Sequence, residues 1–547
     1  MRLGPSLLEI HPRRGESGQA GGLLPRSGGT RSPQAPLGCS TSPQPPPGCS
    51  RSPRARLRGS WVSFLASACV LGVVSLLGPS RTEAGDPSPD RLRKAIEPIL
   101  SRAELASAFW GIEVRSLASG HTLYALNAGK AFRPASTQKL VTTAAALDAY
   151  GPDARLRTTL ETAARLDAKG RLLGDLYLVG RGDPNLSGRF SPGHPTAAFE
   201  AMAEALVGAG VKRVEGRLVG HEGAFSGDRR GASWTWEDLA WGYGTEVSAL
   251  SYADNSVEAS LAPGERPGDP AVLALVPDSG CLNVLSSVTT MEARPGDEVT
   301  LLREPGSNDV RLTGRVPLGG HWDGRLAVDD PAACTAAVFA SVLEARGISI
   351  ASGVATAHAA LPEGARVLAA YDGLPMAEMI KVTNKESQNL HAEMLLRLVG
   401  LKQKGEGSVE NGSAAALAFA ARSSIPTAGW QIQDGSGLAR GDLLTPAGLA
   451  ALLVAMNRHP HAAAFRDSLP IAGVDGTLEK RMRGTAAEKR VVAKTGTSQL
   501  VNALAGYVTT VRGDELAFAA FVNNHAGKGK EAVQALDRVA IALAEAR

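Results

Sequence analysis

PASTQKLVTTAAALDAY, residues 134–150, is the stretch on which the fold assignment depends. Pro134 begins it, an Ala- and Leu-rich run follows, and Gly151 comes directly after it. Proline at the start and glycine past the end of such a run predict a helix. Ser136 and Lys139 are three residues apart, about one turn, and therefore share a helix face. Serine becomes a nucleophile when a base takes its proton, and lysine can be that base if burial or a second cation lowers its pKa.

Two further short motifs follow in the chain. Ser387-Gln388-Asn389 is an S-x-N motif inside a helical run over residues 375–400, and Lys494-Thr495-Gly496-Thr497 is a K-T-G-T motif on a predicted strand. Each motif is common by chance, and S-x-x-K alone would be typical of a solvated helix start. All three in this order, each on the expected element, favour a serine acyl-transfer site in which Lys494 is the second cation.

With these motifs the sequence resembles the active-site serine penicillin-recognising enzymes. Within them it resembles the D-alanyl-D-alanine carboxypeptidase/endopeptidase family of low-molecular-mass class C penicillin-binding proteins. The resemblance spans about residues 90–547, and Asp442 departs from it, because the family pattern has Asn there. The longer stretches that carry it are GDLYLVGRGDPNL (174–186), SQNLHAEMLLR (387–397), DGSGLAR (434–440) and LPIAGVDGTL (469–478).

The resemblance implies an α/β (α+β) fold. The catalytic domain would be β-lactamase/transpeptidase-like, with an antiparallel sheet flanked by helices, and split by inserted β-rich domains. The texture of the sequence agrees, because short strand-like runs separated by Gly, Pro, Asp and Asn fill residues 156–364. That region is too long for a loop and is expected to form domains of its own, two nested domains being favoured over one. Residues 86–155 and 365–547 would then form the split catalytic domain.

The resemblance also implies a role for each residue at the reacting bond. Ser136 would be the acylated nucleophile and Lys139 its general base. Ser387 would relay a proton to the leaving D-alanine, and Asn389 would hold the amide of the acyl chain. The backbone N–H groups of Ser136 and Thr497 would form the oxyanion hole.

The K-T-G-T motif would bind the other end of the substrate. Lys494 would supply positive charge, and Thr495 and Thr497, with Gly496 between them, would bind the terminal carboxylate. β-Lactams would acylate the same serine and persist. The implied reaction needs no cofactor, and the scattered His and Cys residues, without H-x-x-x-H or C-x-x-C spacing, make a metal site unexpected.

Two further residues are candidates for substrate recognition. Arg440, in DGSGLAR, matches a position where the family presents an arginine near the substrate side chain. Asp238, in WTWEDLAWGYG, resembles a carboxylate of the inserted region that receives the free amine of a diaminopimelate residue. The alternative for both is ordinary surface or interdomain ion pairing.

Other candidate residues have simpler interpretations. Ser436 lacks a G-x-S-x-G frame, so a structural turn is favoured over a nucleophile. His391 is better explained as a packed or hydrogen-bonded helix residue than as part of a Ser-His dyad. GRGDP (180–184) follows a strand-like run and predicts a β-turn. Cys281 and Cys334 are 53 residues apart in unrelated segments, so we expect two small buried side chains rather than a disulfide.

The start of the sequence differs in composition from the rest. Residues 1–60 are rich in Pro and Arg, which predicts disorder. Residues 61–84 contain a short apolar run after a basic cluster, which predicts a signal peptide and export to the periplasm. If this segment were not cleaved, it would anchor the protein in the membrane. A lipoprotein site at Cys69 is the weaker alternative, because this cysteine lies inside the apolar run and has Ala66, not Leu, three residues before it.

The net charge of +4 over 547 residues is unevenly distributed. Residues 1–84 contain ten Arg, no Lys and three Glu, which leaves 48 basic and 51 acidic residues, a net charge of −3, in the remainder. Nucleic-acid binding needs clustered Lys and Arg, so that partner is not expected. The leading hypothesis is a serine D,D-peptidase acting on peptidoglycan stem peptides. A cell-wall-binding protein with weak hydrolysis and a β-lactamase are the alternatives, and the oligomeric state is left open.

Overall fold

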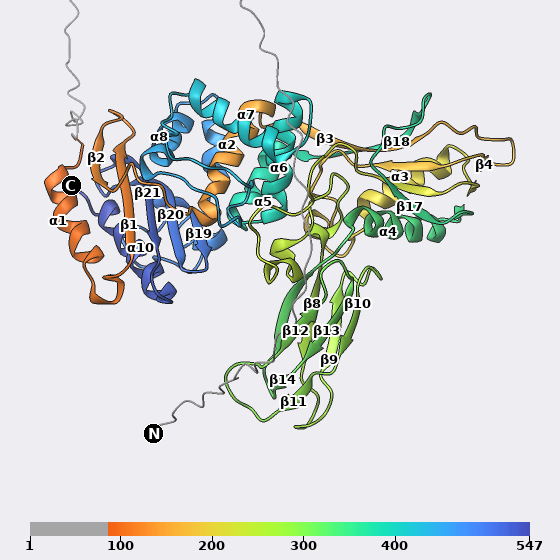
Figure 1. The fold of residues 1–547 in the computed structure, drawn as a ribbon, viewed down its shortest axis with the longest axis horizontal. Coiled ribbons are helices and arrows are strands. Elements are labelled where there is room, and N and C mark those ends of the chain that lie inside the picture. Colours follow the sequence, from red (N-terminus) through yellow and green to blue (C-terminus); the bar gives the residue numbers. More distant parts are fainter. Residues whose placement is uncertain (1–85) are drawn as a thin grey trace, which may run out of the picture. The chain divides into compact units, whose positions relative to one another are not determined.

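The computed structural model describes residues 86–547 (Figure 1). Strands from the beginning and from the end of this range together form one five-stranded sheet. The strand order is β19-β20-β21-β1-β2, and all four neighbouring pairs are antiparallel. The α/β class with an antiparallel sheet is therefore confirmed. The strands are β1 (Phe109–Ser116), β2 (Thr122–Leu126), β19 (Val491–Ser498), β20 (Val501–Thr509) and β21 (Glu515–Asn523).

Helices cover both faces of this sheet, as Figure 1 shows. On one face, α1 (Pro89–Leu100) and α10 (Gly529–Ala544) bury an apolar stripe that includes Leu92 and Ile96. On the other face, α2 (Lys139–Tyr150) and α8 (Pro446–Asn457) are part of a second apolar core. Further helices complete that layer: α5 (Met376–Lys385), α6 (Asn389–Lys404), α7 (Val409–Arg422) and α9 (Ala462–Asp467).

The segment between α2 and α5 contains a second five-stranded sheet, with the order β17-β7-β5-β3-β18. Two helices pack in its core, α3 (Ala197–Gly208) and α4 (Pro331–Ala345), although the sequence predicted only strands there. The strands of this sheet are β3 (Arg155–Thr162), β5 (Leu176–Val179), β7 (Leu218–His221), β17 (Val354–Ala357) and β18 (Arg366–Pro375). A small sheet joins β4 (Arg171–Leu172), β6 (Arg213–Val214) and β16 (Ser349–Ile350).

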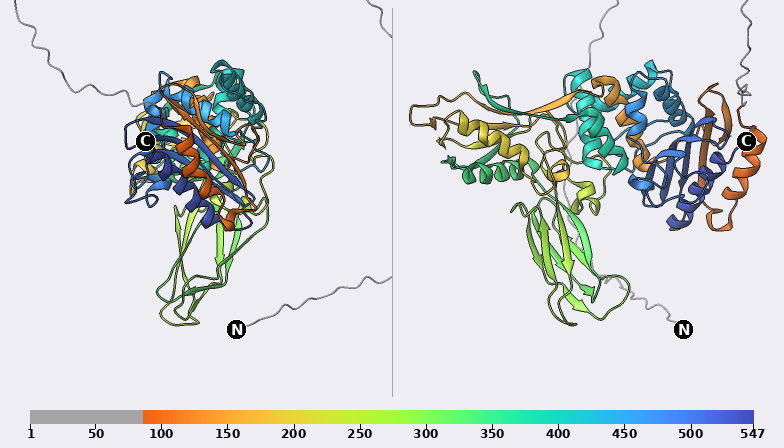
Figure 2. Two further views of the ribbon diagram at one scale, coloured as in Figure 1. Left: turned by 90° about the vertical axis from the view of Figure 1, so that its left-hand side faces the viewer. Right: turned by 180° about the vertical axis from the view of Figure 1, so that it is seen from behind.

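Between β7 and α4 the chain forms another group of strands with its own apolar core, visible as the green strands of Figures 1 and 2. One sheet has the order β15-β8-β9, a second β10-β13-β12, and a strand pair joins β11 to β14. The strands are β8 (Ser256–Ala262), β9 (Val272–Val276), β10 (Asn283–Ser286), β11 (Thr289–Met291), β12 (Thr300–Arg303), β13 (Asp309–Thr313), β14 (Arg315–Pro317) and β15 (Trp322–Ala327).

The structure differs from the sequence expectations at two boundaries. Strand β18 pairs antiparallel with β3, so residues 366–375 belong to the sheet of the insertion rather than to the catalytic sheet. The helical run over 375–400 is broken into α5 and α6, because Ser387 adopts a left-handed conformation with φ of 62°. Gln388 is extended and caps α6, its side chain accepting a hydrogen bond from the N–H of Leu390.

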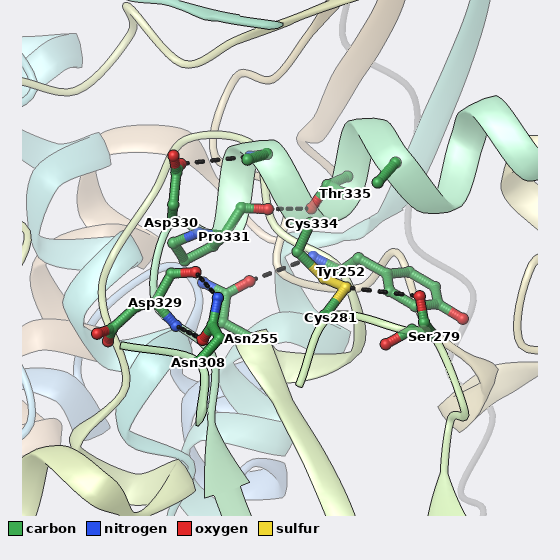
Figure 3. Close-up of a disulfide and its surroundings, with 12 residues drawn as sticks. Tyr252, Asn255, Ser279, Cys281, Asn308, Asp329, Asp330, Pro331, Cys334 and Thr335 are labelled. Atoms are coloured by element: carbon green, nitrogen blue, oxygen red, sulfur yellow. Dashed lines mark hydrogen bonds between the residues drawn. A yellow bond between two sulfur atoms is a disulfide. The ribbon is translucent and has the colours of Figure 1, made fainter. Parts of the chain in front are cut away.

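The expectation for the two cysteines is wrong. Cys281 and Cys334 form a disulfide, which joins the loop before β10 to the first turn of α4 (Figure 3). The fold brings their Cα atoms to 5.4 Å, a distance that sequence spacing could not reveal. The disulfide thus connects the cores on either side of it, since both cysteines pack against both.

The predicted disordered segment (1–60) and the predicted signal peptide (61–84) lie outside the described residues. Within residues 86–547, no helix combines the length and the apolar character needed to cross a membrane.

Candidate active site

Ser136 lies on a single 3₁₀ turn, Ala135–Gln138, that leads directly into α2. Lys139 is the first residue of α2 and its side chain is completely buried. Its ammonium donates hydrogen bonds to the Oγ of Ser136 at 3.0 Å, to the Oδ1 of Asn389 at 2.7 Å and to the carbonyl of Ser436 at 2.8 Å. The local turn brings the serine and the lysine together, and the fold adds an S-x-N residue from 250 positions away.

The environment of Lys139 suits a general base. Burial lowers the pKa of the Lys139 ammonium to about 8, and the nearby Asp434 and Glu393 carboxyl groups oppose part of that shift. A lysine with such a pKa is partly neutral near physiological pH, so it can accept the proton of Ser136.

Ser387 lies in the break between α5 and α6, opposite Lys494 on β19. The Lys494 ammonium donates to the Oγ of Ser387 at 2.8 Å and to the carbonyl of Thr495 at 2.9 Å. Burial, followed by the charge of Lys139, lowers the pKa of Lys494 well below its usual range. Each of the two lysines therefore holds one of the two serines.

Strand β19 passes close to the turn that carries Ser136. A Cβ added to Gly496 would lie 2.8 Å from the carbonyl oxygen of Pro134, so this approach requires glycine. Thr495 is buried and its hydroxyl donates to the hydroxyl of Thr477 at 2.8 Å, whereas Thr497 is exposed. Of the two predicted carboxylate ligands, Thr497 is thus the one open to solvent.

A cavity of about 700 Å³ opens in front of the nucleophile. Four of the sequence-predicted residues besides Ser136 line it: Asn389, Thr497, Arg440 and Asp238. Ser387 lines a second cavity, of about 380 Å³, and Asn389 and Tyr243 line both cavities. Lys139, Lys494, Thr495 and Gly496 are buried, and the two lysines donate to Ser136 and Ser387, which line the cavities.

The two recognition candidates lie at the rim of the large cavity. Asp238 accepts hydrogen bonds at its Oδ2 from the backbone N–H and the hydroxyl of Thr235, at 3.0 and 2.7 Å. Its Oδ1 accepts from the hydroxyl of Tyr243 at 3.3 Å. Arg440 is exposed and donates to the Oε1 of Gln499 at 3.0 Å rather than to a carboxylate. Within residues 86–547, neither side chain forms the ion pair that was the alternative interpretation.

Several residues that support the site had no role in the sequence analysis. Asp434 is fully buried and accepts hydrogen bonds from the N–H groups of Gly437 and Ala439, at 2.6 and 2.7 Å, and from the indole of Trp234 in the insertion, at 2.9 Å. Glu393 accepts from the N–H of Ser436 at 2.9 Å, and burial raises its pKa to about 8. These acceptors shape the turn whose carbonyl binds Lys139.

The alternative candidates take the structural roles predicted for them. Ser436 is buried and its hydroxyl donates to Asp434, so it forms part of a turn. The GRGDP stretch bends at Gly182, with φ of 86°, but the turn itself lies at Pro184 and Asn185, where the carboxylate of Asp183 accepts from the N–H of Asn185. Among the residues that the structure describes, no three His, Cys, Asp or Glu side chains are grouped as a metal site would require.

Comparison with known proteins gives this geometry its context. The profile of the D-Ala-D-Ala carboxypeptidase 3 (S13) family matches residues 92–543. The chain belongs to this family. As a member of the S13 family it is a serine-type D-Ala-D-Ala carboxypeptidase, a hydrolase, and the resemblance inferred from the motifs is confirmed.

Individual S13 relatives align over most of their length. A D-alanyl-D-alanine carboxypeptidase of Actinomadura sp. (strain R39) is 35% identical over 487 residues, covering 86% of this chain and 88% of the relative. D-alanyl-D-alanine carboxypeptidase DacB of Haemophilus influenzae is 28% identical over 400 residues, covering 72% and 80%. The crystal structure of penicillin binding protein 4 from Haemophilus influenzae has the same fold, with a TM-score of 0.70 and 24% identity over 83% of this chain and 98% of that one.

Proposed function

We propose that the protein hydrolyses peptidoglycan stem peptides through an acyl-enzyme on Ser136. The observation that carries the proposal is the 3.0 Å contact between Ser136 and a buried Lys139 whose pKa is lowered to about 8. In acylation, neutral Lys139 takes the hydroxyl proton, and the Oγ of Ser136 attacks the penultimate D-Ala carbonyl carbon. The C–N bond then breaks as Ser387 gives its hydroxyl proton to the leaving nitrogen of the terminal D-alanine and takes up in exchange the proton held by Lys139, so that Lys139 is neutral again and Ser387 is a hydroxyl.

Deacylation restores the enzyme. Water adds to the ester carbonyl as Lys139 accepts one of its protons, and the C–O bond to Ser136 breaks as Oγ takes a proton back. A cross-link cut after D-Ala involves the same acyl group with a different leaving amine, so we include endopeptidase activity in the proposal. In a β-lactam the leaving nitrogen stays tethered to the acyl group, which would make the adduct long-lived.

Labelled penicillin and mass spectrometry test the proposal directly. The expected result is a long-lived adduct on Ser136 that the S136A variant lacks, together with release of D-alanine from a stem pentapeptide. Rapid turnover of the penicillin would favour a β-lactamase instead. Absence of both labelling and D-alanine release would leave a cell-wall-binding protein as the better description.

We also propose that the protein works outside the cytoplasm, in the periplasm. Its proposed substrate is found there, and the Cys281–Cys334 disulfide suits an oxidising compartment. Fractionation of cells that produce the full chain, followed by N-terminal sequencing of the mature protein, tests both the location and the predicted cleavage near residue 84. Recovery of the whole chain in the cytoplasm would contradict this proposal.

A further inference from the structure

Asp254, in the turn before β8 of the insertion, contacts the catalytic domain with its side chain. It is 5% exposed and has a left-handed backbone with φ of 56°. Its carboxylate accepts hydrogen bonds from Arg189 at 2.6 and 3.0 Å, from the Nε2 of Gln388 at 2.9 Å and from the Nε2 of His391 at 3.2 Å. His391 is thus the hydrogen-bonded helix residue that its position predicted.

The partners of Asp254 stand directly beside the S-x-N serine. Gln388 lies between Ser387 and Asn389, and its amide donates to Asp254. On the other side, the carboxylate of Glu386 is held by Arg189 at 3.2 Å. The Arg189–Asp254 pair therefore binds the residues immediately before and after Ser387.

This anchoring matters because Ser387 is strained. A left-handed backbone is unfavourable for a residue other than glycine, and such conformations persist only where the surroundings hold them. Although burial alone would raise it, hydrogen bonds from His391 and Arg189 hold the pKa of Asp254 well below its usual range. Asp254 is therefore a carboxylate, and it can accept from Arg189, Gln388 and His391 at once, with Arg325 as a more distant fourth donor at 3.5 Å.

We propose that Asp254 is a positioning residue for the reaction: it fixes the S-x-N turn so that Ser387 stays on Lys494 and Asn389 stays on Lys139. The insertion then completes the catalytic site instead of only framing the substrate cavity. A second contact points the same way, because the Nδ2 of Asn389 donates to the carbonyl of Tyr243, another residue of the insertion, at 2.8 Å. This inference rests on the proposed acylation of Ser136.

The test compares the variants D254N and Q388E with the wild type. Q388E keeps the oxygen that caps α6 but loses the amide donor and places a second carboxylate against Asp254. In the double variant, the amide introduced at position 254 can donate to the carboxylate introduced at position 388, and the net charge is that of the wild type. D372N is the matched control, because Asp372 is a carboxylate of the insertion in a solvent-exposed ion pair with Arg157.

The readout is stopped-flow acylation by penicillin, separated into the Kd of the noncovalent complex and the saturating rate constant. A catalytic group displaced by about 1 Å can lose about 100-fold in rate, so each single variant is expected to lower the saturating rate by that order while Kd changes little. The double variant should recover at least part of the loss, and D372N should match the wild type.

Acylation of Q388E at the wild-type rate would overturn the inference, even if D254N failed to fold. The inference would also be overturned if the saturating acylation rate of the double variant were reduced by the product of the two single-variant reductions. Because the wild type is measured in parallel, failure of the proposed acylation itself would be seen as an unlabelled wild-type protein and would not be confused with either outcome.

Discussion

The Nζ of Lys139 lies 3.0 Å from the Oγ of Ser136, and the lysine side chain has no exposure to solvent. Since burial lowers the pKa of Lys139 to about 8, its neutral fraction grows as the pH rises toward that value. The saturating rate of penicillin acylation should therefore increase about tenfold per pH unit between pH 6 and 7.5 and level off above pH 8. Stopped-flow measurements across this range check the prediction.

The control for this pH profile is K139R. Arginine keeps its proton throughout the range and cannot act as the base, so this variant should not be acylated at a measurable rate. A rate independent of pH between 6 and 9 in the wild type would show that another group accepts the proton.

Gly437 is expected to tolerate no side chain, because it packs on the turn that carries the nucleophile. Its φ is 81°, and a Cβ added there would collide with the carbonyl oxygen of Ala135. G437A should therefore push the turn with Ser136 away from Lys139 and abolish most penicillin labelling. The matched control is G484A, since Gly484 has φ of 70° but no atom within 4 Å of an added Cβ.

The two glycine variants separate backbone strain from displacement of the nucleophile. Both should lose about 1–2 kcal/mol of stability to the left-handed conformation, as measured by urea unfolding. Only G437A should lose labelling. Equal labelling of the two variants would mean that the turn can move without harm.

Asp442, the residue that departs from the family pattern, should be replaceable by asparagine. Its Oδ1 accepts from the backbone N–H groups of Gln433 and Asp434 at 2.7 and 3.3 Å, contacts that an amide oxygen preserves. Burial, followed by the charge of Asp434, raises the pKa of Asp442 well above its usual range. D442N should thus keep the wild-type acylation rate, while D442A, which lacks the acceptor, should be less stable.

The raised pKa of Asp442 also sets the sign of a pH effect on stability. A carboxyl group with a raised folded-state pKa stabilises most fully below its unfolded pKa, and that contribution is lost as the pH rises through the folded-state pKa. The free energy of unfolding should therefore fall less with rising pH in D442N than in the wild type, and D442N should be the more stable protein at pH 7. Urea unfolding at pH 4, 5.5 and 7 measures this difference, and parallel curves would contradict it.

Local sequence signals predicted a large part of the fold. Pro134 and Gly151 predicted the helix that contains α2, and the K-T-G-T motif was placed on a strand that is β19, because these signals depend on near neighbours. For the same reason, the contact between Ser136 and Lys139 follows from their spacing of three residues.

The long-range contacts of the site could not be predicted in this way. No local pattern links Trp234 to Asp434 or Gln388 to Asp254, since each contact depends on how the insertion docks onto the catalytic helices. The break in the helix at Ser387 was not predicted either, because the residues on both sides of Ser387 are held by contacts with the insertion. Recognition of the motifs supplied the residues of the site, and only the fold supplied the groups that hold them.

The Cys281–Cys334 disulfide is expected to stabilise the insertion without taking part in catalysis. It closes a loop between residues 53 positions apart, for which disulfides typically contribute about 2–4 kcal/mol. The C281S/C334S variant should therefore unfold at lower urea concentration than the wild type. Its folded fraction should still be labelled by penicillin at the wild-type rate, because neither cysteine lines the cavity of Ser136. Unchanged unfolding, or slower labelling of the folded protein, would show that the bond has a different role.

Asp238 should select substrates that carry a free amine on the stem-peptide side chain. It lines the cavity of Ser136, and its two oxygens already accept from Thr235 and Tyr243, an arrangement that fixes the carboxylate in place for a cation. D238N should lower kcat/KM for a diaminopimelate-containing peptide by about 10–100-fold, as expected for loss of a charge-assisted hydrogen bond. The same peptide with its amine acetylated should be cleaved equally by D238N and the wild type. If D238N instead hydrolysed the amine-bearing peptide as well as the wild type does, Asp238 would have no role in recognising it.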